Sequence, residues 1–251
     1  NVFVAFIKRV LQMTLRALIF DVDGTLANTE RDGHRPAFNA AFAEAGLPWH
    51  WDETFYGTLL NIAGGKERIR HYAEHFDPAT CSRPDFEELL QHVHEIKTRN
   101  YQRLLGAGAI PLRADIGQLI CEARTEGLRL AIASSSTSQN VAGLLQANLG
   151  PKADTWFEVI ASGDIVSAKK PAPDIYLWVL KTLGLPACDC LAVEDSAHGL
   201  AASIAAGIPT VITVSDYTIN ENFDGACMVL PQADRITLER LRLWHAAAGT
   251  P

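Results

Sequence analysis

The sequence predicts an α/β fold, in which a doubly wound parallel sheet carries an inserted all-helical domain. From about residue 111 onward, short apolar runs alternate with segments of helical period. This alternation indicates parallel strands with helices on both faces of the sheet. Between residues 30 and 105 the periodic segments have helical spacing, and no strand-like run occurs. The expected domains are therefore a core of residues 1–29 and 106–251 and a helical domain of residues 30–105.

The core is expected to begin with a buried strand at residues 15–20, which ends at a cluster of aspartate and glycine. The apolar pattern predicts further strands at residues 128–133, 157–161, 191–193, 209–214 and 227–230. Helical spacing predicts core helices at residues 116–124, 141–146, 173–183 and 197–206, several of them followed closely by glycine. The inserted domain is expected to contain helices at residues 35–45, 66–76 and 85–105.

The overall composition limits the kind of partner. The chain has 251 residues, of which 48% are hydrophobic, and this is enough for one large domain or a core with a satellite. Its formal net charge of −7 argues against a nucleic-acid binder with a broad basic surface. A small anionic substrate needs only a local cluster of positive groups, so the charge is compatible with one. We expect a monomer that binds a small molecule and no nucleic acid.

Cysteine usage and the apolar segments predict a cytoplasmic protein. The five cysteines are odd in number and lack the spacing of a zinc site, which favours reduced thiols. No apolar run approaches the roughly 18 residues of a membrane span. The apolar N-terminal run at residues 2–7 precedes Lys8 and Arg9, the reverse of the order in a secretory signal.

Two aspartates, Asp21 and Asp23, follow the first predicted strand, at the edge of the sheet where ligands of such folds bind. Carboxylates this close repel each other unless a cation or a proton intervenes. Their oxygens suit a hard divalent cation such as Mg²⁺, beside which one carboxylate can act as a nucleophile while the other transfers protons. The alternative is structural, an Asx-type turn in which Gly24 supplies the bend.

A phosphate could be bound at two later positions. Ser134 and Ser135 follow a predicted strand just ahead of a helix, and offer hydroxyl and N–H groups to an anion. Lys170 precedes a proline, whose restricted backbone would let the ammonium be aimed at a phosphate or at Asp21. Taken singly, the serines could instead cap a helix, and the lysine could be an ordinary surface residue.

An acidic pair, Glu194 and Asp195, follows the predicted strand at residues 191–193 and would add carboxylates to a metal site. Taken alone, Asp195 or Ser196 could be the cap of the next helix. The structural readings do not explain, however, why all of these groups follow consecutive strand-like runs. Together they supply a nucleophile, an acid/base, a phosphate anchor, a cation and metal ligands, which favours an active site.

This set of residues resembles the haloacid dehalogenase superfamily, whose core is a Rossmann-like sheet. The first motif of that superfamily, D-x-D-G-T, corresponds to residues 21–25, DVDGT. The second motif, a serine or threonine after a strand, corresponds to Ser134, and the third, a lysine before proline, to Lys170. The fourth, an acidic pair, corresponds to Glu194 and Asp195. The resemblance covers the chain from about residue 15 onward.

The resemblance implies a mechanism and a cofactor. In this superfamily the first aspartate forms an aspartyl-phosphate, and the second donates a proton to the leaving group and later activates water. The implied catalytic residues are Asp21, Asp23, Ser134 and Lys170. The implied ligands of the cofactor Mg²⁺ are Asp21, Asp23, Glu194 and Asp195. Members with a helical insert after the first motif use it as a cap over the site, and residues 30–105 look like that cap.

A closer resemblance lies in the insert. The segments NTERDGHRPAFNAAF (residues 28–42) and WHWDETFYGTLLNIAGGKERI (residues 49–69) look like those of CbbY-type phosphatases of the Calvin cycle. These enzymes remove phosphate from xylulose-1,5-bisphosphate. KKPAPDIY (residues 169–176) and EDSAHGL (residues 194–200) agree, although β-phosphoglucomutase shares them. The expected substrate-binding residues are Glu30, Gly65, Lys66, Arg68, Ser134, Ser135 and Lys170.

Physical chemistry is compatible with a second anion site in the insert. Gly64 and Gly65 ahead of a helix let an anion approach backbone N–H groups, and Lys66 and Arg68 add positive charge. Without the family resemblance, a helix start with ordinary surface charges is the favoured interpretation of this segment.

The function expected from the sequence is a Mg²⁺-dependent phosphatase that hydrolyses a sugar bisphosphate, xylulose-1,5-bisphosphate, through an aspartyl-phosphate. The alternative is a phosphosugar mutase of the β-phosphoglucomutase type, which also needs two phosphate sites. A dehalogenase fits less well, because Asp23 would have no leaving-group oxygen to protonate. A catalytically inactive binding protein is a further class, but such proteins usually lose a nucleophile or metal ligand, and Asp21, Asp23, Lys170 and Asp195 are all present.

Overall fold

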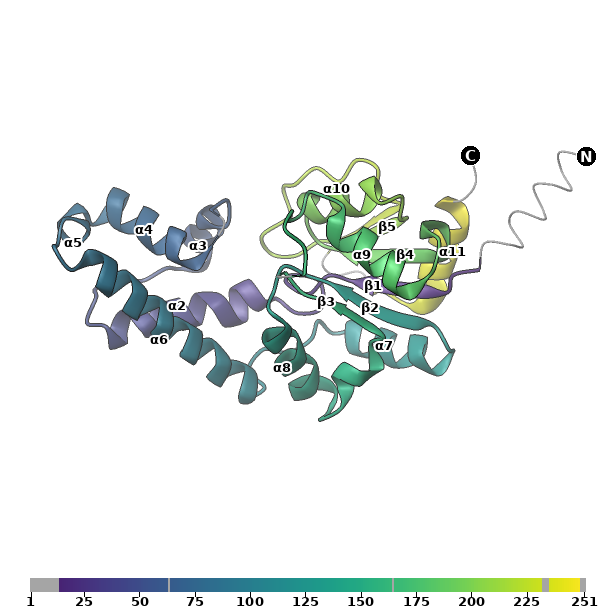
Figure 1. Cartoon of the computed structure of the whole chain (residues 1–251), viewed down its shortest axis with the longest axis horizontal. Coiled ribbons are helices and arrows are strands. Elements are labelled where there is room, and N and C mark those ends of the chain that lie inside the picture. The colour runs from purple at the N-terminus through teal and green to yellow at the C-terminus, as the bar shows by residue number, and fades with distance from the viewer. Residues whose placement is uncertain (1–13, 63, 164, 232–234, 249–251) are drawn as a thin grey trace, which may run out of the picture. The chain divides into compact units, whose positions relative to one another are not determined.

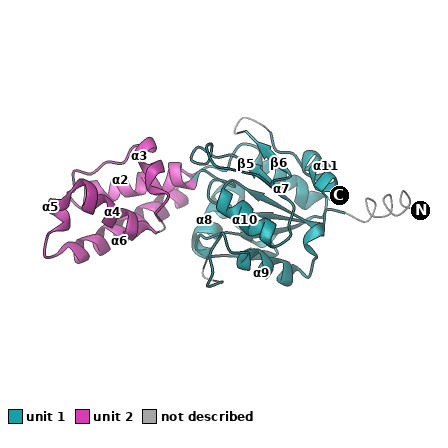
Figure 2. Cartoon of the chain, turned by 90° about the horizontal axis from the view of Figure 1, so that it is seen from above, with its two compact units in different colours: residues 1–28, 111–251 teal, residues 29–110 magenta. Residues whose placement is uncertain are grey.

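The computed structural model of the chain describes residues 14–62, 64–163, 165–231 and 235–248. The apolar run at residues 2–7 lies outside them. The chain forms two compact units: unit 1 comprises Asn1–Asn28 and Pro111–Pro251, and unit 2 comprises Thr29–Ile110 (Figure 2). The second boundary therefore lies five residues later than the expected one. Ile110 is buried within unit 2, because its side chain packs against Gly33 and Tyr101.

Unit 1 is built on a six-stranded parallel sheet with the order β3-β2-β1-β4-β5-β6. The strands are β1 (Ala17–Phe20), β2 (Arg129–Ala133), β3 (Val159–Ala161), β4 (Cys190–Glu194), β5 (Thr210–Thr213) and β6 (Met228–Leu230). The first strand of the chain lies in the middle, where Phe20 is opposite Ile132 on one side and Val193 on the other. The polar residues that follow β1, β2 and β4 therefore meet at one edge of the sheet.

Helices cover both faces of this sheet, as the doubly wound fold requires (Figure 1). They are α7 (Ile116–Thr125), α8 (Ser138–Leu149), α9 (Asp174–Leu183), α10 (Ala197–Ala205) and α11 (Leu238–Ala248). Alternate strand residues such as Ile19, Ala131 and Ala192 pack in one cluster with the apolar face of α9, which includes Tyr176 and Val179. All of the strand residues named here are buried, which accounts for the continuous apolar runs in the sequence.

Unit 2 contains only helical elements among its described residues. They are a single π-helical turn, η1 (Glu30–His34), and the helices α2 (Arg35–Glu44), α3 (Glu53–Leu59), α4 (Gly65–Phe76), α5 (Pro78–Cys81) and α6 (Phe86–Gly106). Its core is rich in aromatic rings centred on Trp51, which is fully buried and packs against Phe38, Phe42 and Tyr56. This packing fixes α2 and α3, and α3 carries Tyr56, which is discussed below.

The predicted α/β fold with a parallel sheet is confirmed, but three helices were missed. Both α3 and α5 are short, at 7 and 4 residues, and each begins at an aspartate that accepts a backbone hydrogen bond. Such short helices carry too few turns for a period to stand out. The third, α11, does show helical spacing in its buried residues Leu238, Leu241 and His245, so the sequence held a usable signal. The helix expected at residues 141–146 is also longer, because Thr137 caps it and Gly150 follows its last turn.

Two sequence-level expectations concern the environment of the protein. All five cysteines lie within the described residues, and all are free. Among the helices of the described residues, none is both long and apolar enough to cross a membrane.

Candidate active site

The loop after β1 brings a backbone turn against a carboxylate. Asp21 continues the sheet, because its N–H donates to the carbonyl of Val193 at 3.0 Å. The chain then turns at Gly24, which has φ of +88°. A Cβ atom at this position would lie 2.0 Å from Oδ2 of Asp195. Glycine is therefore required twice, for the left-handed backbone and for the close approach of a carboxylate.

Lys170 is the centre of the charged network. Its Nζ donates to Oδ1 of Asp21 at 2.7 Å, to Oε1 of Glu194 at 2.6 Å and to the carbonyl oxygen of Ala133 at 2.8 Å. These three bonds use every donor of the ammonium group. Burial alone would lower the pKa of Lys170, but the attraction of Asp21 and Glu194 outweighs burial and raises that pKa. Lys170 is therefore a fixed positive charge beside Asp21.

Glu194 is held from two further directions. The Tyr176 hydroxyl donates to Oε1 of Glu194 at 2.5 Å, and the ammonium of Lys170 lies 5.2 Å from the centre of the Tyr176 ring. Oε2 of Glu194 faces the start of α10, where a Cβ atom on Gly199 would lie 2.0 Å from it. Glu194 is almost fully buried, so these contacts leave its carboxylate little freedom to move.

Three buried carboxylates, those of Asp21, Glu194 and Asp195, could hold a metal ion, because each offers an oxygen within 4.8 Å of the others. Burial, together with the charges of Glu194 and Asp23, raises the pKa of Asp21 to about 8, although Lys170 acts in the opposite direction. Burial and the charges of Asp21 and Glu194 also raise the pKa of Asp195. A divalent cation would relieve this repulsion, and an all-oxygen donor set suits Mg²⁺.

Asp23 lies apart from that group. Its Oδ2 accepts a hydrogen bond from the hydroxyl of Ser136 at 2.8 Å. Ser134 is buried, and its hydroxyl oxygen accepts a bond from the Ser136 N–H at 3.0 Å. Ser135 is exposed, and Gly163 lies so close to it that a Cβ atom there would be 2.3 Å from the Ser135 carbonyl. Asp23 is thus oriented toward the serine loop, whereas Asp21 faces Lys170.

In unit 2, two of the expected substrate-binding residues form an ion pair. Arg68 NH1 lies 3.4 Å from Oε1 of Glu30 and donates to the Tyr56 hydroxyl at 3.1 Å, while Tyr56 donates to Oε2 of Glu30 at 2.5 Å. Arg68 Nε also donates to the carbonyl oxygen of Ile62. The side chain of Arg68 is only 13% exposed. The positive charge expected of Arg68 is therefore largely matched by Glu30 within the same unit.

The start of α4 places Lys66 near His94 of α6. Gly64, with φ of +99°, precedes the helix. A Cβ atom on Gly65 would lie 3.0 Å from Nε2 of His94 on α6. Lys66 donates to the side chain of Gln91. Gln91 is neutral, so this bond does not pair the ammonium with an acidic group. Burial, with the nearby charges of Lys97 and Lys66, lowers the pKa of His94.

Several residues of these networks were not singled out from the sequence. Ser136 directly follows Ser134 and Ser135, and Tyr176 stood within the KKPAPDIY segment, so local signals existed for both. Tyr56 also stood within a quoted segment, that of residues 49–69, whereas His94 stood in none; both come from other helices, α3 and α6, and meet α4 only in the folded unit. Their contribution depends on tertiary packing.

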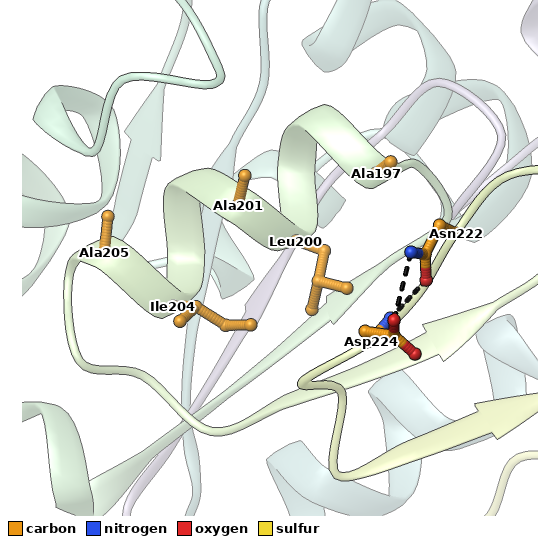
Figure 3. A pocket seen from close by; sticks show the side chains of 7 residues that line it. All are labelled: Ala197, Leu200, Ala201, Ile204, Ala205, Asn222 and Asp224. Atoms are coloured by element: carbon orange, nitrogen blue, oxygen red, sulfur yellow. Dashed lines mark hydrogen bonds between the residues drawn. The ribbon is translucent and has the colours of Figure 1, made fainter.

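A groove of about 420 Å³ lies along α10, and none of Asp21, Glu194 and Asp195 lines it (Figure 3). Its polar groups are Asn222 and Asp224, which hydrogen-bond each other, and the rest of its lining is apolar. It offers no positive group for a phosphate. We therefore place the chemistry at Asp21, Glu194 and Asp195 and not in this groove.

Comparisons with known proteins agree with this geometry. The family model of haloacid dehalogenase-like hydrolases matches residues 15–207. The chain is 52% identical over 217 residues to Protein CbbY of Cupriavidus necator, and the match covers 86% of this chain and 85% of that protein.

Two solved structures are also similar. One is CbbY from Rhodobacter sphaeroides in complex with phosphate, with 42% identity and a TM-score of 0.76. The other is a mutant of that protein in complex with xylulose-1,5-bisphosphate, with 41% identity and the same TM-score. Each comparison covers 91% of this chain and 99% of the other. The chain therefore belongs to the haloacid dehalogenase-like hydrolases, and within them it is a phosphatase of the CbbY type.

Proposed function

We propose that this enzyme is a Mg²⁺-dependent phosphatase that removes one phosphate from a sugar bisphosphate, with xylulose-1,5-bisphosphate as the preferred substrate. The observation that carries the proposal is the buried pairing of Asp21 with Lys170 beside Glu194 and Asp195. A carboxylate with a fixed cation and a metal-binding group at its side suits attack on a phosphoryl group, whose negative charge must be balanced. The substrate assignment is supported by the likeness to the CbbY structure that holds xylulose-1,5-bisphosphate.

In the proposed reaction, an oxygen of Asp21 attacks phosphorus and the bond between phosphorus and the ester oxygen breaks. Asp23 gives its proton to the departing sugar oxygen. In the second step Asp23 takes a proton from water, and the resulting hydroxide attacks the phosphorus of the aspartyl-phosphate, which releases inorganic phosphate and restores Asp21. The bond from Ser136 supports this division of roles, because it directs the Asp23 carboxylate away from Lys170.

Mg²⁺ would be held by the side chains of Asp21 and Asp195, by the main-chain carbonyl of Asp23, and by Glu194 directly or through water. When bound, it would neutralise the charge of the phosphoryl oxygens. Lys170 supplies a further positive charge for that group, and Ser134 with the N–H of Ser135 supplies hydrogen-bond donors.

We propose that unit 2 is the cap that recognises the substrate. Lys66, with the N–H groups at the start of α4, would bind the second phosphate. Its ammonium donates to the neutral side chain of Gln91, so this bond does not offset its positive charge. His94 lies against Gly65 and could donate to the same phosphate. In this proposal Arg68 has a less direct role than Lys66. Held by Glu30 and Tyr56, it would orient Glu30 toward the sugar hydroxyls and add its charge at short range.

The test is phosphate release from a panel of sugar phosphates with and without Mg²⁺. The panel contains xylulose-1,5-bisphosphate, other five- and six-carbon bisphosphates, matching monophosphates and β-glucose-1-phosphate. We expect the highest kcat/KM for xylulose-1,5-bisphosphate. Isomerisation of β-glucose-1-phosphate without net release of phosphate would instead establish the mutase. No turnover of any compound would overturn the proposal.

A further inference from the structure

Arg113 makes an unusual set of contacts near the buried carboxylates of Asp21, Glu194 and Asp195. The reaction described above assigns it no role. It lies two residues after the chain returns to unit 1. Its NH1 donates to the carbonyl oxygens of Gly24 at 2.6 Å and Thr213 at 2.8 Å, and its NH2 donates to that of Val214 at 2.9 Å. One guanidinium group therefore joins two loops that are about 190 residues apart in the sequence.

Both loops come close to Asp195. The Gly24 turn is so close that a Cβ atom there would be 2.0 Å from Oδ2 of Asp195. Ser215 follows Val214 directly, and its hydroxyl donates a hydrogen bond to the Asp195 carboxylate. The position of the Asp195 carboxylate thus depends on both loops. The guanidinium of Arg113 connects these loops through its hydrogen bonds to their carbonyl oxygens.

Hydrogen bonds of the main chain fix the position of the backbone from which the Arg113 side chain extends. Its own N–H donates to the carbonyl oxygen of Leu26 at 2.8 Å. The preceding residue, Leu112, forms an antiparallel bridge with Ala27, and its N–H donates to Oδ1 of Asn148 at 3.0 Å. The Gly24 turn is closed by a bond from its N–H to the carbonyl of Ala27 at 2.8 Å. Arg113 therefore extends from the same small network that holds the turn.

We propose that Arg113 is a positioning residue for the metal site: it holds the Gly24 turn and the end of β5 at a fixed separation, and thereby holds Asp195 in the orientation that binds Mg²⁺. This inference rests on the proposed function, because it takes Asp195 as a metal ligand. It adds a residue outside the four sequence motifs, which acts on the ligand Asp195 through the two loops and also through its positive charge.

Arginine suits this task because its planar guanidinium carries donors in fixed, diverging directions. Three carbonyl oxygens from two loops can accept from it at once without distortion. Lysine keeps the positive charge, but its single ammonium group is a compact point charge that cannot reproduce this fork. Arg113→Lys therefore removes the geometry and keeps the charge, which separates positioning from simple electrostatic attraction.

The experiment measures the dissociation constant of Mg²⁺ by titration calorimetry, without substrate, for the wild-type chain and for Arg113→Lys. Mutation of a residue that positions a metal ligand typically weakens metal binding about 10- to 100-fold. We therefore expect the dissociation constant of Mg²⁺ to rise by about that factor in Arg113→Lys. We also expect kcat at saturating Mg²⁺ to recover most of its wild-type value, while the Mg²⁺ concentration needed for half-maximal activity rises in parallel. Arg242→Lys is the matched control, because Arg242 is an exposed arginine of the same unit that pairs with Glu126.

The outcomes separate this inference from the proposed function. If the wild-type chain binds no Mg²⁺, the metal part of the proposed function fails. If it does bind Mg²⁺ and the affinity of Arg113→Lys stays within about threefold of wild type, against the expected 10- to 100-fold, the positioning role is wrong. Arg113→Gln, which keeps two donors, is the second variant. Should neither variant fold, as judged by circular dichroism, the role of Arg113 is structural and the proposal is also overturned.

Discussion

The charged residues of unit 1 and those of unit 2 are organised in different ways. In unit 1, Lys170 bonds to two carboxylates and a carbonyl, and the side chains of Lys170 and Asp21 are 11% and 9% exposed. In unit 2, Lys66 bonds to a neutral amide, while Arg68 is neutralised by Glu30. The first arrangement has an excess of buried negative charge, and the second offers positive charge to an anion.

This difference suggests how the two units divide the work. Three buried carboxylates that repel one another are costly unless a cation binds among them. Their presence in unit 1 therefore indicates a metal site and chemistry at phosphorus. A lysine paired with a neutral group can exchange that partner for a phosphate at little cost. The large energetic effects should therefore come from unit 1, and the effects on substrate choice from unit 2.

Removal of Mg²⁺ should have the largest effect. Without the cation, Asp21, Glu194 and Asp195 repel one another, and burial and this repulsion raise the pKa of Asp21 to about 8, which disfavours the carboxylate form that the proposed attack needs. We expect phosphate release to fall to background after exhaustive chelation and to return when Mg²⁺ is added. Ca²⁺, which is larger and less demanding in geometry, should inhibit instead of substituting. Full activity after chelation would contradict the metal assignment.

Asp21→Asn should reduce turnover about a hundredfold or more, because an amide cannot attack phosphorus. The fold should persist, since the substitution removes one charge from a repelling group and preserves its shape. Steady-state kinetics and circular dichroism measure the two effects. A loss of less than about tenfold would show that Asp21 is not the nucleophile.

Asp23→Asn should slow both the formation and the breakdown of the phospho-enzyme, each by about a hundredfold or more. The reason is that, in the proposed reaction, the same carboxylate serves as acid in the first step and base in the second. Rapid-quench kinetics separate the two steps. Ser136→Ala is the matched control, because it removes the hydroxyl that orients Asp23 and keeps the carboxylate; a smaller loss is expected. Wild-type rates of both steps in Asp23→Asn would refute the role.

Lys66→Ala sharpens the comparison between the units. A charge-assisted contact contributes roughly 1.5–3 kcal/mol, so kcat/KM for a sugar bisphosphate should fall about 10- to 100-fold, mainly through KM. An aryl monophosphate, which has no second phosphate, should be hydrolysed almost as before. Equal losses for both substrates would assign Lys66 a structural or catalytic role, and no loss for either would place substrate recognition elsewhere.

Tyr176→Phe should have the smallest effect. It removes one hydrogen bond to Glu194, whose Oε1 still accepts from Lys170. A bond to a charged group contributes about 1.5–3 kcal/mol, and we expect the free energy of unfolding, measured in urea, to fall by about this amount or less. The requirement for Mg²⁺ should remain. An unchanged free energy of unfolding would show that this bond contributes nothing net to stability.

The sheet and the residues at its edge could be predicted from the sequence because their signals are local. A strand buried on both faces is a continuous apolar run, and the polar residues that end β1, β2 and β4 stand directly after such runs. Parallel pairing then brings Asp21, Ser134 and Glu194 together without any knowledge of the loops.

The remaining contacts could not be predicted, because they join residues through packing. The acceptors of Arg113 are backbone carbonyls, which leave no mark in the amino-acid sequence. The bond from Tyr56 to Glu30 depends on how α3 packs against the aromatic core of unit 2. For the same reason, the pairing of Arg68 with Glu30 could not be read from the sequence, and the role of Arg68 as an anion ligand stays a prediction.

The most direct test of the whole account is to trap the phospho-enzyme. The wild-type enzyme is mixed with Mg²⁺ and xylulose-1,5-bisphosphate, quenched in acid within one turnover, digested with trypsin and analysed by mass spectrometry. We expect one added phosphoryl group on the peptide of residues 17–31, located at Asp21 by fragmentation, and no such group in Asp21→Asn. Turnover of the substrate with no phosphorylated peptide, or with the phosphoryl group on another residue, would contradict the account.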